Sequence, residues 1–228
     1  MGFLADSFAS AFRLIATFHP DVVSAARTSL VVSAWAIVFA SLLGLPLGLA
    51  IGLSEFPLKR FAVTVLNSLV ALPTVVVGLV VYGVISRQGP LGFLGLLFTP
   101  AAMVIGGSLL AAPIVANYAL AAARGADPRI LPTARTLGAG PVQAVVKFVA
   151  ETRFGILAAV IAGFGRVISE VGVAMMLGGN IRGFTRTMTT AIALQTSMGE
   201  FAFGMALGII LMSVAFVINV FLGVLQQR

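Results

Sequence analysis

Apolar residues in this chain gather into long runs that contain no charged side chain. Four such runs cover residues 28–54, 61–86, 88–123 and 201–227. A helix needs about 20 consecutive apolar residues to cross the hydrocarbon core of a bilayer. The third run exceeds one span, and its first part, QGPLGFLGLLFTP, is rich in the glycine and proline typical of a loop or re-entrant turn.

A fifth stretch, 152–177, is mostly apolar, and its only charged residues are Arg153, Arg166 and Glu170. The pattern therefore predicts one all-α integral membrane domain over 1–228. It has about five transmembrane helices, expected at 28–54, 61–86, 100–123, 152–177 and 201–227. Prolines inside three of these spans are expected to kink their helices: Pro46, Pro73 and Pro113.

Small residues recur every four positions in two of the spans and predict close helix packing. They are Gly44, Gly48 and Gly52 in the first span and Gly204 and Gly208 in the last.

Residues 1–19 form a short stretch of mixed polarity before the first span. It predicts an amphipathic segment lying on the membrane surface, the alternative being a frayed terminus. Its apolar side would consist of Phe3, Leu4, Phe8, Phe12 and Ile15.

Composition makes the bilayer the solvent of this protein. Hydrophobic residues are 60% of the chain and charged residues 9%, so one soluble core of this size would leave much apolar surface in water. The net charge of +7 indicates cytoplasmic loops and anionic lipid headgroups as contacts, and not nucleic acid. With no cysteine, the chain has no disulfide, zinc–thiolate site or iron–sulfur cluster.

The distribution of Lys and Arg predicts an N-terminus outside and a C-terminus inside the membrane. In that orientation the cytoplasmic basic residues are Lys59, Arg60, Arg124, Arg129, Arg135, Lys147, Arg153 and Arg228. The outer ones are Arg13, Arg27, Arg87, Arg182 and Arg186.

Catalytic motifs are missing. The sequence has no GxxxxGK[ST] loop for ATP, and its single histidine, His19, excludes an HExxH metal site. We therefore expect a non-catalytic subunit without a cofactor or metal of its own, whose energy comes from another protein.

The cytoplasmic segment 124–151 predicts two short helices between the third and fourth spans. Asp127 and Pro128 are typical of an N-cap and a first helical position, and residues 138–140 break the chain. Pro141 then starts a second helix with apolar residues at helical spacing: Val142, Val145, Val146 and Val149. A solvated loop does not need apolar faces, so a docking surface is the favoured interpretation.

The stretch PTARTLGAGPVQAVVKF, 132–148, resembles the EAA motif, the coupling segment in permeases of ATP-binding cassette (ABC) importers. Gly138 matches the motif's glycine and Ala134 its second alanine, whereas Pro132 replaces the usual glutamate and Thr133 the first alanine. The resemblance implies that these residues, with Asp127, Ala139 and Gly140, contact an ATPase subunit.

Two further stretches, 72–106 and 163–197, are similar to the molybdate and tungstate permeases, and their sequences look closest to the tungstate branch. The resemblance implies a type I importer in the bacterial cytoplasmic membrane. It would contain two permease copies, two ATPase subunits that bind ATP and Mg, and an external oxyanion-binding protein. Molybdate and sulfate are the alternative substrates. A secondary transporter and an anion channel are the alternative classes.

Arg166 and Glu170 share one helix face inside the fourth span, where a lone charge is costly. Two interpretations stay open: the pair lines or gates the anion route, or it is an interior salt bridge that fixes helix positions. Asn117 and Tyr118 in the third span are polar enough to face the bundle interior.

The segment after the fourth span predicts a hydroxyl-lined route for an oxyanion. Its candidate route or gate residues are Met176, Thr185, Thr187 and Thr189. Arg182 and Arg186 would raise the anion concentration at the outer mouth, or instead contact headgroups or the binding protein.

Overall fold

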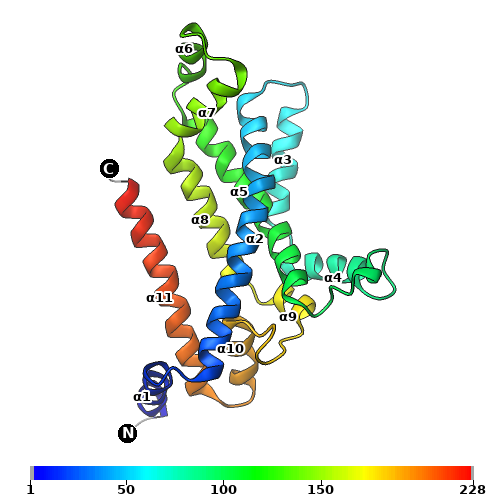
Figure 1. The fold of residues 1–228 in the computed structure, drawn as a ribbon, viewed down its shortest axis with the longest axis vertical. Helices are drawn as coiled ribbons and strands as arrows, with labels where there is room; N and C mark the ends of the chain where they lie inside the picture. Colours follow the sequence, from blue (N-terminus) through cyan, green and yellow to red (C-terminus); the bar gives the residue numbers. More distant parts are fainter. Residues whose placement is uncertain (1–2, 227–228) are drawn as a thin grey trace.

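The computed structural model describes residues 3–226, and this part of the chain is helical without strands. Figure 1 shows a bundle with two short helices at one end and a helical layer at the other. The helices are α1 (Phe3–Ala16), α2 (Pro20–Leu53), α3 (Lys59–Val70), α4 (Thr74–Ile85), η1 (Gly92–Leu94), α5 (Pro100–Gly125), α6 (Ile130–Thr136), α7 (Pro141–Glu151), α8 (Arg153–Ile168), α9 (Gly172–Gly178), α10 (Met188–Ser197) and α11 (Phe201–Gln226).

Three helices, α2, α5 and α11, are each long and apolar enough to cross a bilayer, by length and composition. Two further candidates are broken helix pairs: α3 and α4 are bent by 93°, and α8 and α9 by 61°. Within the described residues there are thus up to five crossings. α2 starts at Pro20, before the expected residue 28, because proline is favoured in the first turn of a helix.

The expected spans over 61–86 and 152–177 each consist of two helices with a break between them. Pro73 has no N–H to donate and disfavours helical geometry at Leu72, so α3 ends at Val70 and α4 starts afresh in another direction. The second break falls at 169–171, where no proline occurs. Pro46 and Pro113, in contrast, lie inside unbroken helices.

The core forms where α2 crosses α5 with little space between their backbones. A Cβ atom added to Gly48 would lie 2.2 Å from the Ala116 carbonyl oxygen, so only glycine permits this approach. The predicted ridge of Gly44, Gly48 and Gly52 is therefore a real packing surface. Gly208 meets nothing within 4 Å in the described chain.

The two ends of the bundle differ. α6 and α7 protrude at one end, whereas α1, α10 and the loop 179–187 lie at the other (Figure 1). α1 packs on α11, buries Ala11 and leaves Phe8 and Phe12 exposed. Its placement on a membrane stays a prediction. The side chains of Phe3 and Leu4 and the position of Arg228 lie outside the described part.

A coupling surface and a junction of broken helices

The first turn of the protruding segment is organised by Asp127. Its carboxylate accepts the Arg129 backbone N–H at 2.9 Å and the guanidinium at 3.0 Å. The Arg129 guanidinium holds the pKa of Asp127 below its ordinary value. α6 begins only at Ile130, with Arg129 at the N-cap position, so the expected helix start at Asp127 and Pro128 is wrong by two residues. Asp127 closes the turn before the helix instead of capping the helix.

The expected break at 138–140 and the start of a second helix at Pro141 are both found. Gly138 has φ +85°, a left-handed conformation that favours glycine, and nothing lies within 4 Å of an added Cβ. The Gly140 N–H donates to the Gln143 side-chain oxygen at 2.9 Å, which caps α7.

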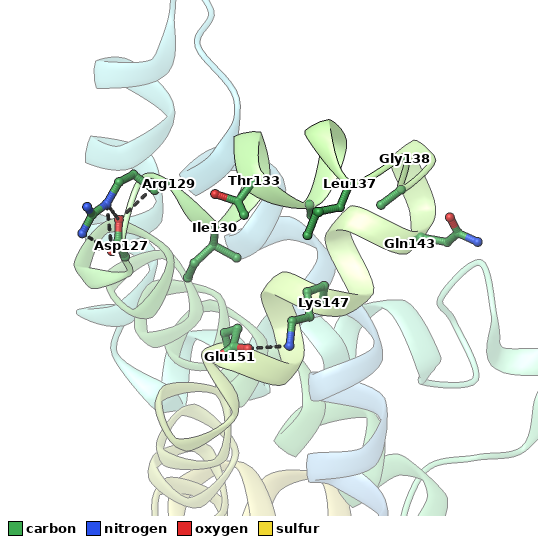
Figure 2. Close-up of a pocket in the computed structure, with 11 residues that line it drawn as sticks. Asp127, Arg129, Ile130, Thr133, Leu137, Gly138, Gln143, Lys147 and Glu151 are labelled. Carbon is green, nitrogen blue, oxygen red and sulfur yellow. Dashed lines mark hydrogen bonds and ion pairs between the residues drawn. The ribbon is translucent and has the colours of Figure 1, made fainter.

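A groove of about 730 Å³ runs along α6 and α7 (Figure 2). Of the residues predicted for coupling, five line it, and Pro132 and Gly140 do not. The lining residues are Asp127, Arg129, Ile130, Thr133, Ala134, Leu137, Gly138, Ala139, Gln143, Lys147 and Glu151. Lys147 and Glu151 form an ion pair of 2.6 Å on its wall, so the groove combines apolar and polar groups.

Three large apolar side chains in or beside the groove are mostly exposed. Leu137 is 82% exposed, Val142 76% and Val146 62%. α7 is anchored by its other face, where Phe148 is 2% exposed and packs with Leu49 and Ala123. Val149, expected on the outer face, packs in that inner cluster. We call the groove together with Leu137, Val142 and Val146 the coupling surface.

The second candidate site is the place where the two helix breaks meet. A Cβ added to Gly172, at the start of α9, would lie 3.1 Å from the Thr74 hydroxyl at the start of α4. Breaks at bilayer depth are tolerated only where protein or water satisfies the freed backbone groups. We call residues 71–74 and 169–172 the junction.

Glu170 forms hydrogen bonds with several polar groups at the junction. Its Oε2 accepts Arg166 Nη1 at 2.6 Å and its Oε1 accepts the Val173 N–H at 3.2 Å. Its backbone carbonyl accepts the Thr189 hydroxyl at 2.7 Å. The carboxylate thus competes with the continuing helix for the Val173 N–H, which explains a break without proline. Glu170 is 6% exposed and the Arg166 side chain 34%, so the pair lies at the edge of the protein interior.

The threonines predicted to line the route are buried and hold the loop 179–187. Thr185 donates to the Gly178 carbonyl at 2.5 Å and accepts the Ile181 N–H, and Thr187 caps α10. Met176 faces α4, since its sulfur would lie 3.0 Å from a Cβ at Gly78. These contacts position α9 and α10, and a role of the four residues in the route stays a prediction.

The two outer arginines differ in their surroundings. Arg182 binds the Asp21 carboxylate through two hydrogen bonds, 2.8 and 2.5 Å, which compensates its charge. Arg186 is half-buried, and its Nη2 donates to the Asn180 carbonyl at 3.5 Å. Sequence reasoning missed Asp21 and Thr74, because their partners come from distant segments. Within residues 3–226 no three His, Asp or Glu side chains gather as a metal site.

No family model matches the chain. It is nevertheless 41% identical to the tungstate uptake system permease protein TupB of Peptoclostridium acidaminophilum, with 100% of both chains covered. The TupB of Campylobacter jejuni is 40% identical over 96% of this chain and 92% of that protein. A probable anion ABC transporter permease protein of Haloferax volcanii is 39% identical over 87% and 88%. The chain belongs to the TupB family of ABC transporter permeases.

Solved structures support the fold of this TupB-family permease. The MetNI methionine ABC transporter in an inward-facing form matches with a TM-score of 0.75 at 16% identity, over 92% of this chain and 96% of that one. A bacterial ABC transporter that imports alginate matches with 0.74 at 19% identity, over 100% and 84%. The predicted all-α membrane fold of a type I importer permease is confirmed. The relatives are named permease proteins, in keeping with a membrane subunit that performs no catalysis.

Proposed function

We propose that this chain is the membrane subunit of an ATP-driven importer that moves tungstate into the cytoplasm. Two copies would form the conduit, two ATPase subunits would bind ATP and Mg, and an external binding protein would deliver the anion. Kinship to two proteins named for tungstate uptake supports the substrate. Molybdate and sulfate are the same kind of tetrahedral dianion and remain the alternatives.

The coupling surface is the observation that carries the proposal. Leu137, Val142 and Val146 expose apolar side chains on a part of the chain that lies beyond the spans. Such a cluster at a groove is typical of a protein interface. The chain has no phosphate-binding loop, so an ATPase is the partner that this surface needs. An uncoupled channel would not need such a docking surface.

Seven basic residues support a cytoplasmic position of this end. Lys59 and Arg60 start α3, and the others are Arg124, Arg129, Arg135, Lys147 and Arg153 on or beside α5 to α8. Cytoplasmic ends of membrane helices are enriched in Lys and Arg. The N-terminus would then be outside and the C-terminus inside.

The connection of α7 to α8 suggests how force would travel. Only Thr152 separates the two helices, and α8 runs from Arg153 to the junction near Glu170. Phe148 ties α7 to α2 and α5 at the same time. When ATP draws the ATPases together, α6 and α7 would move with them, and α8 would carry the displacement to the junction.

Gly138→Trp tests this function in proteoliposomes that contain the permease, its ATPase and its binding protein. Wild type is expected to take up tungstate only with ATP. The indole would project from the coupling surface, so the variant should lose both ATPase association and uptake. Gly199→Trp is the matched control, because Gly199 has φ +84° and open space but lies between α10 and α11. It carries the same backbone strain of about 1–2 kcal/mol and should keep the ATPase bound.

Three results would contradict the proposal. They are a wild-type permease that never co-purifies with an ATPase, a Gly138→Trp variant with normal uptake, and sulfate uptake that excess tungstate does not inhibit. The last result would leave the importer in place and remove tungstate as its substrate.

A further inference from the structure

The exposed side of α2 is apolar over the whole depth of a bilayer. From residue 30 to residue 50 every exposed residue is uncharged, and the indole N–H of Trp35 is the one polar group among their side chains. These residues are Leu30, Val31, Ala34, Trp35, Val38, Phe39, Leu42, Leu43, Pro46, Leu47 and Ala50. This side of the molecule is suited to lipid.

The exposed side of α3 has a different character. Leu66 is 3% exposed and packs with Ala116 and Leu120 of α5, which fixes the inner face of the helix. Beside the exposed apolar residues Phe61 and Val65, exposed Thr64, Asn67 and Ser68 share one helix face with Arg60, and Asn67 lies at the edge of that face next to α5. We call Arg60, Thr64, Asn67 and Ser68 the α3 stripe. The hydroxyls of Thr64 and Ser68 bond within the helix, whereas the N–H groups of the Asn67 amide would have no partner in lipid, so the Asn67 edge of this face needs water or protein beside it.

Asn67 is the best donor of the stripe. Its Oδ1 accepts Asn117 Nδ2 of α5 at 2.5 Å. That bond orients the Asn67 amide and leaves its two N–H groups without a partner among the described residues. The hydroxyls of Thr64 and Ser68 donate to the carbonyls four residues earlier, at 3.0 and 2.9 Å, and can rotate to donate outward.

The stripe joins two places that the proposed function already uses. One end of α3 meets the junction, where the helix stops at Val70 before Thr74. The other end carries Arg60, which is exposed and forms no ion pair with a described residue, at the α6–α7 end of the bundle. The neutral donors Asn67, Thr64 and Ser68 thus lie between the junction and the positively charged side chain of Arg60.

We propose that the inner half of the oxyanion route runs along this stripe. It rests on the proposed function. A tetrahedral dianion accepts hydrogen bonds from Asn67, Thr64 and Ser68. Because these donors are neutral, they hold the anion weakly enough for release, and Arg60 draws it to the inner end. Arg166 is less suited to this task than Arg60, since Glu170 compensates its charge.

The test uses isosteric changes in the full complex: Thr64→Val, Asn67→Leu and Ser68→Ala together, and Asn67→Asp alone. Both variants should assemble with the ATPase as wild type does. Tungstate uptake should fall by about tenfold or more, because hydrogen bonds to a charged group are lost or replaced by repulsion. Ser213→Ala is the matched control and should leave uptake unchanged. Ser213 is exposed on α11 and, like Ser68, donates to the carbonyl four residues earlier.

Two outcomes would overturn the inference while the proposed function stands. In one, the triple variant takes up tungstate at the wild-type rate. In the other, it fails to form the permease dimer, which would make the stripe a contact between two copies. If wild type itself shows no ATP-driven uptake, the proposed function fails, and the inference fails with it.

Discussion

At the scale of single residues, the sequence predicts contacts between neighbours and misses those that the fold creates. Arg166 and Glu170 pair as their spacing of four indicates. Arg182 pairs with Asp21, which lies 161 positions away, and no pattern points to that partner. Thr185, Thr187 and Thr189 are predicted from the sequence to line a route for the anion. They are buried, because Thr185 and Thr189 donate to backbone carbonyls and Thr187 bonds neighbouring threonine hydroxyls at the start of α10.

The Arg166–Glu170 pair gives a prediction about stability. Arg166→Leu would leave a carboxylate that is 6% exposed without its cation, and breaking such a pair costs roughly 3–5 kcal/mol. Adding Glu170→Gln removes the stranded charge and keeps an oxygen for the Val173 N–H. We expect the double variant to have a higher Tm in detergent than Arg166→Leu alone, and to recover most of the uptake.

The same two variants separate the two interpretations of the pair. Recovery of stability and uptake together is expected if the pair fixes the junction. Recovery of stability with uptake still absent would assign it to the route or gate. Equal Tm values for the single and double variants would mean that the unpaired Glu170 carboxylate is not destabilising, and would contradict this prediction.

At the scale of helices, the sequence predicts which segments are helical, but it does not predict the direction in which each helix runs. The apolar runs predict α2, α5 and α11, and Gly138 with Pro141 predicts the break before α7. Pro73 signals an interruption, but the 93° turn of α4 depends on its packing against α9. The break at 169–171 contains no proline that could signal it. The Glu170 side chain accepts the Val173 N–H there, at the start of α9.

The anchoring of α7 leads to a prediction on force transmission. Phe148→Ala removes the side chain that ties α7 to α2 and α5, at a cost of about 3–5 kcal/mol. The coupling surface is on the other face of α7, so the ATPase should still co-purify and hydrolyse ATP. Uptake per ATP hydrolysed should fall. Val142→Ala, which alters an exposed side chain of the same helix, should change stability little. Normal coupling in Phe148→Ala would contradict the path through α7.

At the scale of the whole molecule, the two ends of the bundle are predicted to face opposite sides of the membrane. The sequence supplies the count of spans and the basic bias, and the fold supplies two exposed positions that report on it. Leu137 is 82% exposed between α6 and α7, and Met198 is 67% exposed between α10 and α11. The chain has no cysteine, so a cysteine introduced at either position is the only thiol of this protein that a reagent can label.

Leu137→Cys and Met198→Cys therefore measure the orientation directly. A thiol reagent that cannot cross membranes should label Met198→Cys in intact cells and leave Leu137→Cys unlabelled. In inside-out vesicles the pattern should reverse, because the coupling surface then faces the medium. The reverse pattern in cells would place the coupling surface outside, away from ATP, and no ATPase could act on it there. Labelling of both positions from one side would mean that the two ends are not separated by an odd number of crossings, and the five-span arrangement would be wrong.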